Sequence, residues 1–155
     1  MTLGHEKLDV YQLAINYVAW VYQRAETLTG AHRHARDQWL RASQSIPLNI
    51  AEGNGKSAPA DRRRYFEIAR GSALECAAIQ DVLFVGSALE KEEHETRKQD
   101  INRMSLMLSG LGGRGFSIEE PQAPYGWGVV VDDTDIDCDG DFDNALLKSQ
   151  PQSPL

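Results

Sequence analysis

The sequence predicts an all-α protein, an up-down-up-down four-helix bundle followed by a disordered acidic C-terminal tail. Three observations lead to this fold class. Apolar residues recur at helical spacing in four stretches. Glycine or proline separates these stretches at short intervals, which makes successive helices antiparallel neighbours. No convincing strand pattern lies between them. We therefore assign residues 1–115 to the bundle and residues 116–155 to the tail.

The first expected helix spans residues 8–29 and has one buried side. Its apolar residues recur at steps of three and four, namely Val10, Ala14, Tyr17, Val21, Ala25 and Leu28. Gly30 follows as a stop signal. The second expected helix spans residues 32–54. Pro47 lies inside it and removes a backbone donor, so we expect a kink or a break between Ser43 and Pro47.

The third expected helix spans residues 58–88, with Ser57 as its cap and Pro59 in its first turn. It carries two apolar stripes, which indicates contacts on two sides. Gly71 in its middle costs about 1 kcal/mol of helix propensity, a cost that is explained if another backbone approaches closely there. The fourth expected helix spans residues 90–111, and glycines then end the folded body.

Charge is distributed unevenly along the chain, whose formal net charge is -7. Residues 1–115 hold 15 basic and 14 acidic residues, a net charge of +1. Residues 116–155 hold Lys148 against nine acidic residues, a net charge of -8. Within the body, residues 33–70 hold eight basic and four acidic residues, a net charge of +4. We call this segment the basic zone.

Composition argues against a membrane-spanning or secreted protein. No stretch approaches the roughly 18 to 20 apolar residues that span a bilayer, and the N-terminus lacks a basic start followed by an apolar run. We therefore expect a cytoplasmic protein with no membrane partner. Cys76 and Cys138 have neither disulfide-framework nor metal-knuckle spacing, which agrees with a reducing compartment. Cys76 lies on a helical stripe and is expected to be a small core residue.

Three motifs carry a resemblance to a known family. They read LDVYQLA over residues 8–14, SIPLNIAEG over residues 45–53 and RYFEIARGSALE over residues 64–75. In this order they closely resemble the four-helix-bundle proteins encoded in intervening sequences of bacterial 23S ribosomal RNA genes. The resemblance implies an all-α bundle, a ring-shaped homopentamer and no known catalysis. A related branch is the accessory protein of diversity-generating retroelements, which binds a reverse transcriptase and nucleic acid through a basic surface.

The basic zone supplies candidate nucleic-acid-binding residues. They are Arg41, Lys56, Arg62, Arg63, Arg64 and Arg70. Guanidinium forks match phosphate oxygens in a bidentate way, and an oligomer repeats such a patch on every subunit. The alternative is a solvated face whose charge is offset by Asp61 and Glu67.

The small and polar residues of the two longer motifs are candidate structural residues. They are Pro47, Asn49, Glu52, Gly53, Gly71, Ser72 and Glu75. Paired carboxylates can serve acid–base catalysis, but no nucleophile and base accompany Glu52 and Glu75, so we expect no enzyme. We expect these groups to cap the bend at Pro47 and to fix the helix register. Glu52 or Glu75 is then expected to pair with Arg41 or Arg70 across the second and third helices.

The tail carries an isolated metal-binding motif. Its candidate calcium ligands are Asp135, Asp137, Asp139, Asp141 and Asp143. Their spacing around Gly140 reproduces most of a calcium loop. Leu146, however, stands where a bidentate Glu is expected. The alternative is a flexible acidic segment, so we assign no obligatory cofactor. The histidines lack helical metal spacing, and we expect His5, His32, His34 and His94 in loops or on the surface.

These observations favour a non-enzymatic, homo-oligomeric scaffold or accessory protein that contacts RNA or DNA through the basic zone. The alternative is a calcium-responsive protein-interaction module that uses the Asp-rich tail. The expected partners are further copies of the chain in a homopentamer, together with RNA, DNA or a reverse transcriptase.

Removal of residues 116–155 is expected to strengthen RNA binding, because a tail of net charge -8 competes with phosphate for Arg62, Arg63, Arg64 and Arg70. Anisotropy titrations of the full and truncated chains in roughly 50 mM salt measure the gain. Replacement of Arg62, Arg63 and Arg64 together by Ala should abolish it. Equal RNA affinity of the two chains would exclude competition by the tail.

Overall fold

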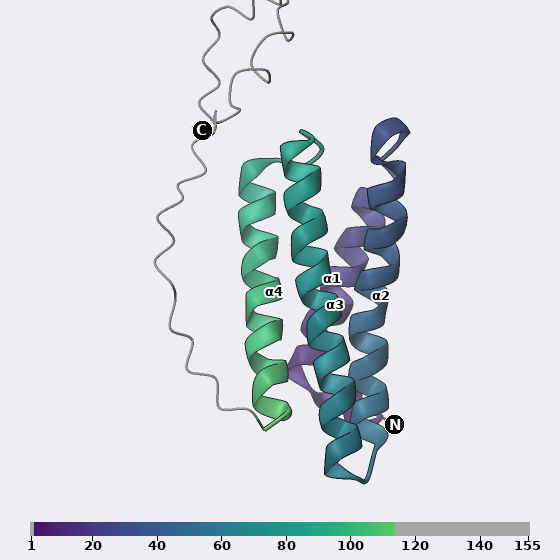
Figure 1. Ribbon diagram of the computed structural model, residues 1–155, viewed down its shortest axis with the longest axis vertical. Coiled ribbons are helices and arrows are strands. Elements are labelled where there is room, and N and C mark those ends of the chain that lie inside the picture. Colours follow the sequence, from purple (N-terminus) through teal and green to yellow (C-terminus); the bar gives the residue numbers. More distant parts are fainter. Residues whose placement is uncertain (1, 114–155) are drawn as a thin grey trace, which may run out of the picture. The chain divides into compact units, whose positions relative to one another are not determined.

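The computed structural model describes residues 2–113, and these form four α-helices joined by short turns (Figure 1). The helices are α1 (Asp9–Ala25), α2 (Arg33–Gly55), α3 (Pro59–Val85) and α4 (Lys91–Leu111). The short 3-10 helices Gly4–Lys7 and Gly30–His32 precede α1 and α2. Since the described residues contain no strand, the expected all-α class is confirmed.

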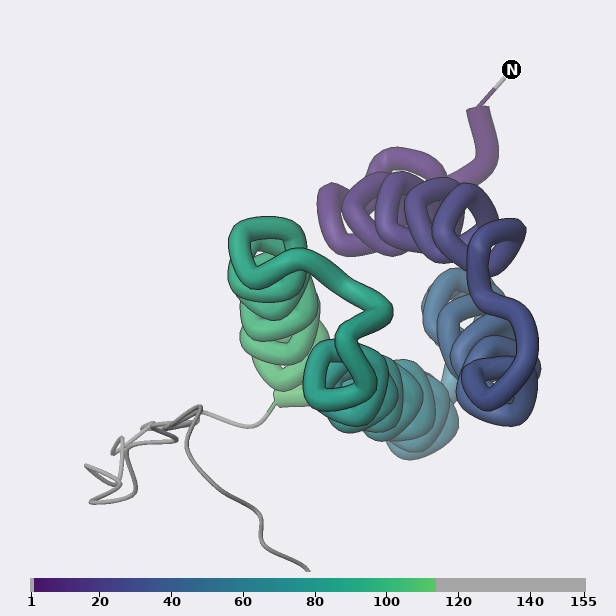
Figure 2. Tube along the Cα trace, turned by 90° about the horizontal axis from the view of Figure 1, so that it is seen from above, coloured from purple at the N-terminus to yellow at the C-terminus, as the bar shows by residue number. Residues whose placement is uncertain are grey.

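The four helices follow one another around the bundle. Seen along its length, α1, α2, α3 and α4 occupy successive corners, so that α1 lies diagonally opposite α3 (Figure 2). The contact between α2 and α3 is the most extensive, and the contact between α1 and α4 is the least extensive of the neighbouring pairs. All four helices contribute to one apolar core, whose largest members include Tyr17, Trp39, Phe66, Ile101 and Met104.

The helix ends differ from expectation where side chains or backbone bonds stop the helix early. α1 ends at Ala25, where the amides of Thr27 and Leu28 bond three residues back, to the Arg24 and Ala25 carbonyls at 3.1 and 3.2 Å, and the Thr27 hydroxyl also donates to the Arg24 carbonyl at 2.8 Å. α3 ends at Val85 because Ser87 adopts a left-handed backbone with φ 57°. The Ala88 amide then donates to the Leu83 carbonyl at 2.8 Å, which closes a Schellman motif.

The start of α3 also corrects an expectation. Ala58, and not Ser57, is the N-cap residue, and no side chain caps the helix. Pro59 occupies the first turn as expected, where its missing amide proton leaves no intrahelical bond unmade.

α2 passes through Pro47 as one continuous helix, so of the expected kink or break the break is absent. The proline leaves the Ser43 carbonyl without its usual amide donor, at a cost of roughly 3 kcal/mol in a helix interior. Burial offsets this cost, because Pro47 itself is buried and Trp39, Ile46 and Ile50 of the same helix are fully buried.

A buried polar network joins α1, α2 and α3. The hydroxyl of Tyr17, which is 0% exposed, accepts from Trp39 Nε1 at 3.0 Å and from Gln80 Nε2 at 2.8 Å. The thiol of Cys76 neighbours the same hydroxyl. Burial raises the pKa of Tyr17 far above its usual range and the pKa of Cys76 to about 12, so both groups stay neutral. Cys76 is a core residue, as expected.

Polar side chains connect α1 to α4. Trp20 Nε1 donates to Glu93 Oε1 at 2.6 Å, and Arg24 Nη2 lies 2.9 Å from Glu93 Oε2. The guanidinium of Arg97 lies 5.0 Å from the centroid of the Trp20 ring. These contacts join the neighbouring pair of helices that packs least extensively.

Tyr17→Phe is expected to lower the free energy of unfolding by about 1 to 3 kcal/mol, because the buried donors of Trp39 and Gln80 lose their acceptor. Urea unfolding followed by circular dichroism measures the change. Tyr22→Phe is the matched control, since the exposed Tyr22 hydroxyl accepts from Gln44 at 2.8 Å and water can replace it. Equal losses in the two variants would contradict a special role for the buried hydroxyl.

Candidate nucleic-acid interface

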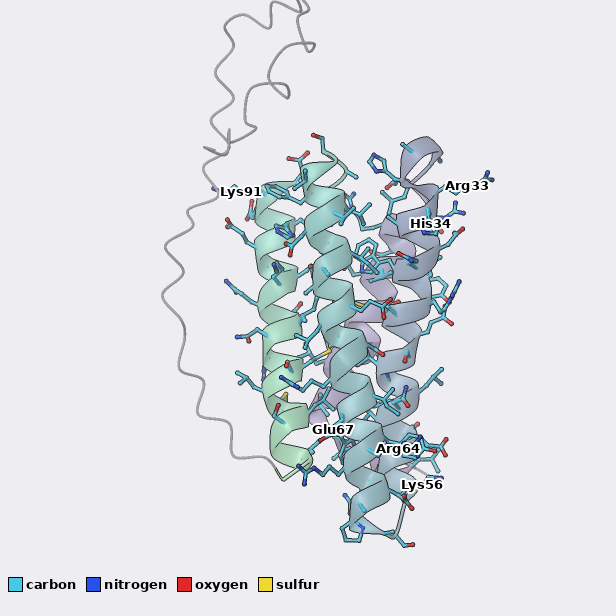
Figure 3. All side chains as sticks on the ribbon, viewed as in Figure 1. Arg33, His34, Lys56, Arg64, Glu67 and Lys91 are labelled. Carbon is cyan, nitrogen blue, oxygen red and sulfur yellow. The ribbon has the colours of Figure 1, made fainter. Side chains whose placement is uncertain are left out.

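Four of the predicted nucleic-acid-binding residues gather around the turn between α2 and α3. Lys56 follows the last residue of α2, and the three turn arginines, Arg62, Arg63 and Arg64, occupy the start of α3 with exposed side chains. Figure 3 shows Lys56 and Arg64 at this end of the bundle and Arg33 and His34 at the other. The turn therefore concentrates positive charge at one end of the molecule.

The other two predicted residues, Arg41 and Arg70, lie away from this turn. The Ser45 and Ser72 hydroxyls are 2.8 Å apart, which fixes the level of α2 against α3. Arg41 lies one turn before Ser45, and a rise of 1.5 Å per residue places it about 20 Å from the turn. Arg70 lies beside Ser72 and is half-buried. The basic zone is continuous in sequence but not on the surface.

Two of the basic side chains near the turn are already paired with carboxylates. Lys56 Nζ lies 2.8 Å from Glu52 Oε1, and this contact lowers the pKa of Glu52 and raises the pKa of Lys56. Arg63 Nε lies 3.2 Å from Glu67 Oε1. Among residues 2–113, no carboxylate lies within ion-pair distance of Arg62 or Arg64, so these two are the more available to an external anion.

The expected carboxylate pairs across α2 and α3 are wrong. Glu52 pairs with Lys56 one turn later on its own helix, because that position brings an ammonium within reach without crossing to α3. Glu75 is exposed and makes no ion pair with a described residue.

Asn49 and Ser72 connect α2 to α3 through a directed chain of hydrogen bonds. Ser72 Oγ donates its proton to the Ile68 carbonyl at 3.1 Å, so Ser45 supplies the proton of the bond between the two hydroxyls. Asn49 Nδ2 donates to Ser45 Oγ at 3.0 Å and to the Ser45 carbonyl at 2.7 Å. Asn49 therefore does not supply the donor that the Ser43 carbonyl lacks because of Pro47.

The two motif glycines have opposite surroundings. A Cβ on Gly53 would lie 3.0 Å from both Tyr65 Cβ and Phe66 Cε1, so its absence lets α2 approach α3 closely. Gly71 was expected to meet another backbone, and this expectation is wrong within the described chain. A Cβ on Gly71 would meet nothing within 4 Å, because the glycine lies on the outer face of α3.

One histidine departs from the expected loop or surface position. His94 is buried on α4, where its ring stacks on Phe84 with centroids 4.6 Å apart and its Nε2 lies 3.2 Å from Asp81 Oδ1. Lys98 Nζ lies 2.7 Å from the same Asp81 oxygen. Among the described residues no group of histidine, cysteine or carboxylate side chains is arranged to hold a metal. The predicted calcium ligands, Asp135 to Asp143, lie outside the described residues.

The fold and its motifs can be compared with known proteins. The family model described as 23S rRNA-intervening sequence protein matches residues 6–110. The chain belongs to this family. The resemblance predicted from the three motifs is thereby confirmed. No curated protein matches the chain.

A solved structure supports the fold of this family member. It is a protein of unknown function from the S23 ribosomal protein family of Bacteroides thetaiotaomicron, with a TM-score of 0.63 and 20% identity. The match covers 68% of this chain and 96% of that chain. At this identity the likeness shows the fold alone. In the described part of the present family member, none of the helices is both long and apolar enough to cross a bilayer.

Gly53→Ala is expected to lower the free energy of unfolding by about 1 to 3 kcal/mol, because the new methyl group overpacks the contact with Tyr65 and Phe66. Gly55→Ala is the matched control two residues later, where a Cβ would meet no atom within 4 Å. Its effect should stay within about 0.5 kcal/mol or be stabilising. Denaturant unfolding compares the two, and a Gly53→Ala protein as stable as Gly55→Ala would exclude the close-approach role.

Proposed function

We propose that this family member is a non-enzymatic, homo-oligomeric scaffold or accessory protein that contacts RNA or DNA through basic side chains at the α2–α3 turn. The observation that carries the proposal is an apolar stripe on the outer face of α3, which we call the outer stripe. Its residues recur at steps of three and four and are all exposed: Gly71, Leu74, Ala78, Val82 and Val85.

The outer stripe is larger than a scattering of single exposed residues. It extends over about 21 Å of helix at 1.5 Å per residue. Val82 is 63% exposed and Val85 is 77% exposed, although both are fully apolar. Contiguous apolar surface of this kind marks interaction sites on otherwise monomeric proteins. The open position at Gly71 leaves room for a neighbouring chain to approach the α3 backbone.

A second apolar surface lies on α1 and α2. Ile15 and Tyr22 of α1 are each nearly half exposed, and Leu48 of α2 is 67% exposed. The hydrogen bond between Gln44 and Tyr22 places Leu48 one turn further along α2, beside the preceding turn of α1. Both surfaces are therefore available to a second copy of the chain.

The two apolar surfaces favour a head-to-tail assembly. Because α1 and α3 are diagonal in the bundle, their outer faces point in opposite directions (Figure 2). A contact between two different patches is heterologous, and it closes into a ring when the rotation per subunit permits. A homopentameric ring remains the assembly that we propose, with the turn arginines repeated on every subunit and their attraction for phosphate multiplied.

Two further parts of the proposal concern catalysis and partners. The polar motif residues Asn49 and Ser72 serve contacts between helices, which supports a non-enzymatic role. A reverse transcriptase remains a proposed protein partner. The calcium-responsive alternative depends on aspartates outside the described residues, whereas the outer stripe favours the oligomeric scaffold.

Val82→Glu is expected to dissociate the assembly, because each subunit would bury a charge in an apolar contact. Size-exclusion chromatography with light scattering measures the mass, and the variant should return one subunit of 17.2 kDa. Leu106→Glu is the control, since Leu106 is a partly exposed leucine on α4 outside both apolar surfaces. A wild-type mass of one subunit at micromolar concentration would contradict homo-oligomerisation.

A further inference from the structure

A cavity of about 520 Å³ opens between the start of α3 and the end of α4. Ser57, Pro59, Ala60, Arg62 and Arg63 line one side, and the chain from Leu111 to Gly113 lines the other. This volume falls within the range of small-molecule sites. No acidic and no aromatic side chain is among the lining residues. The polar side chains of the wall are thus one hydroxyl and two guanidinium groups.

The two arginines of this cavity differ in what already binds them. Arg62 has no carboxylate of residues 2–113 within ion-pair distance. Arg63 uses its Nε for Glu67 at 3.2 Å, which leaves its two terminal nitrogens as donors. Both guanidinium groups therefore retain nitrogens that can bind an anion in a bidentate way.

The backbone adds donors to those of the arginines. α3 starts beside the cavity without a side-chain cap, so the amides of Ala60 and Asp61 have neither a helical acceptor nor a capping one. The positive end of the helix dipole lies on the same side. The helix start supplements the arginine pair and is not the basis of the site.

We propose that this cavity binds the phosphate group of a nucleotide or of a nucleic acid. The inference rests on the proposed nucleic-acid contact and assigns it to a concave site formed by Arg62 and Arg63. A phosphate carries several acceptor oxygens and at least one negative charge, which suits a wall that offers donors and cations. Since no aromatic side chain lines the cavity, it has no surface on which a base could stack. The cavity therefore recognises phosphate and not base sequence.

Binding of short single-stranded RNA to the full chain tests the site. The probes are one RNA with a 5′-phosphate and the same RNA with a 5′-hydroxyl, with inorganic phosphate and adenosine 5′-monophosphate as competitors. The double variant Arg62→Ala, Arg63→Ala should bind RNA about tenfold more weakly at low salt, a loss of about 1.4 kcal/mol. Both side chains are exposed, so circular dichroism should show an unchanged helix content.

The matched control removes the same charge elsewhere. Arg33→Ala, Arg103→Ala replaces two exposed arginines outside the cavity, and its RNA affinity should fall less than twofold. The variant Arg62→Lys, Arg63→Lys keeps the charge but loses the guanidinium forks, and it should recover only part of the affinity. Equal losses of RNA affinity in the two alanine variants would overturn the cavity as a phosphate-binding site. RNA binding would then be explained by attraction to the net charge of the protein.

The probes also separate the sources of the phosphate. A preference for 5′-phosphorylated RNA, with displacement by the mononucleotide, assigns the cavity to a terminal or free phosphate. Equal binding of both RNAs that is lost in the Arg62 and Arg63 variant assigns it to an internal phosphodiester. RNA binding that this variant leaves intact would overturn the cavity while the proposed nucleic-acid contact stands. A wild-type chain that binds no probe would overturn both the cavity and the proposed nucleic-acid contact. The light-scattering mass tests homo-oligomerisation separately.

Discussion

The buried hydroxyl of Tyr17 is the contact on which the arrangement of the first three helices depends. It is the shared acceptor of Trp39 on α2 and Gln80 on α3, and neither donor has another hydrogen-bond acceptor in the described core. A shift of α2 or α3 by one turn would leave a buried donor unsatisfied, at a cost comparable with a large fraction of the stability of a small domain. Apolar packing alone tolerates such shifts better. The hydrogen bonds therefore select one register among several that would bury similar apolar area.

That register determines what lies at each end of the bundle. With α2 and α3 fixed at Tyr17 and again at Ser45 and Ser72, the close approach at Gly53 follows, because α2 there lies level with Tyr65 and Phe66. The start of α3 is then presented beside the last residues of α4. The arginine-lined cavity is thus a consequence of helix register and does not require a specialised loop.

The sequence predicts the helices well because apolar spacing is a local property, and it predicts their ends less well because single hydrogen bonds decide them. α1 ends early where the amides of Thr27 and Leu28 bond three residues back, and α3 ends early at a serine in a conformation that usually favours glycine. At the candidate site, Arg41 was predicted together with the turn arginines because they are close in sequence. The rise of α2 nevertheless places Arg41 far from the turn. The cavity itself could not be predicted, because its second wall comes from Leu111, about fifty residues after Arg62. The buried network of Tyr17 could have been predicted from Gln80, because a polar residue on an apolar helix stripe needs a buried hydrogen-bond partner.

The short turn between α2 and α3 has a consequence for how the chain folds. Only residues 56–58 separate these helices, so the loss of chain entropy on bringing them together is small. Most contacts join helices that are adjacent in sequence, an arrangement of low contact order that is typical of folding in microseconds to milliseconds. Two bonds of α1 span much more of the chain, because 63 positions separate Tyr17 from Gln80 and 73 separate Trp20 from Glu93. During synthesis the contact of α1 with α4 can therefore form only after the last helix has been made.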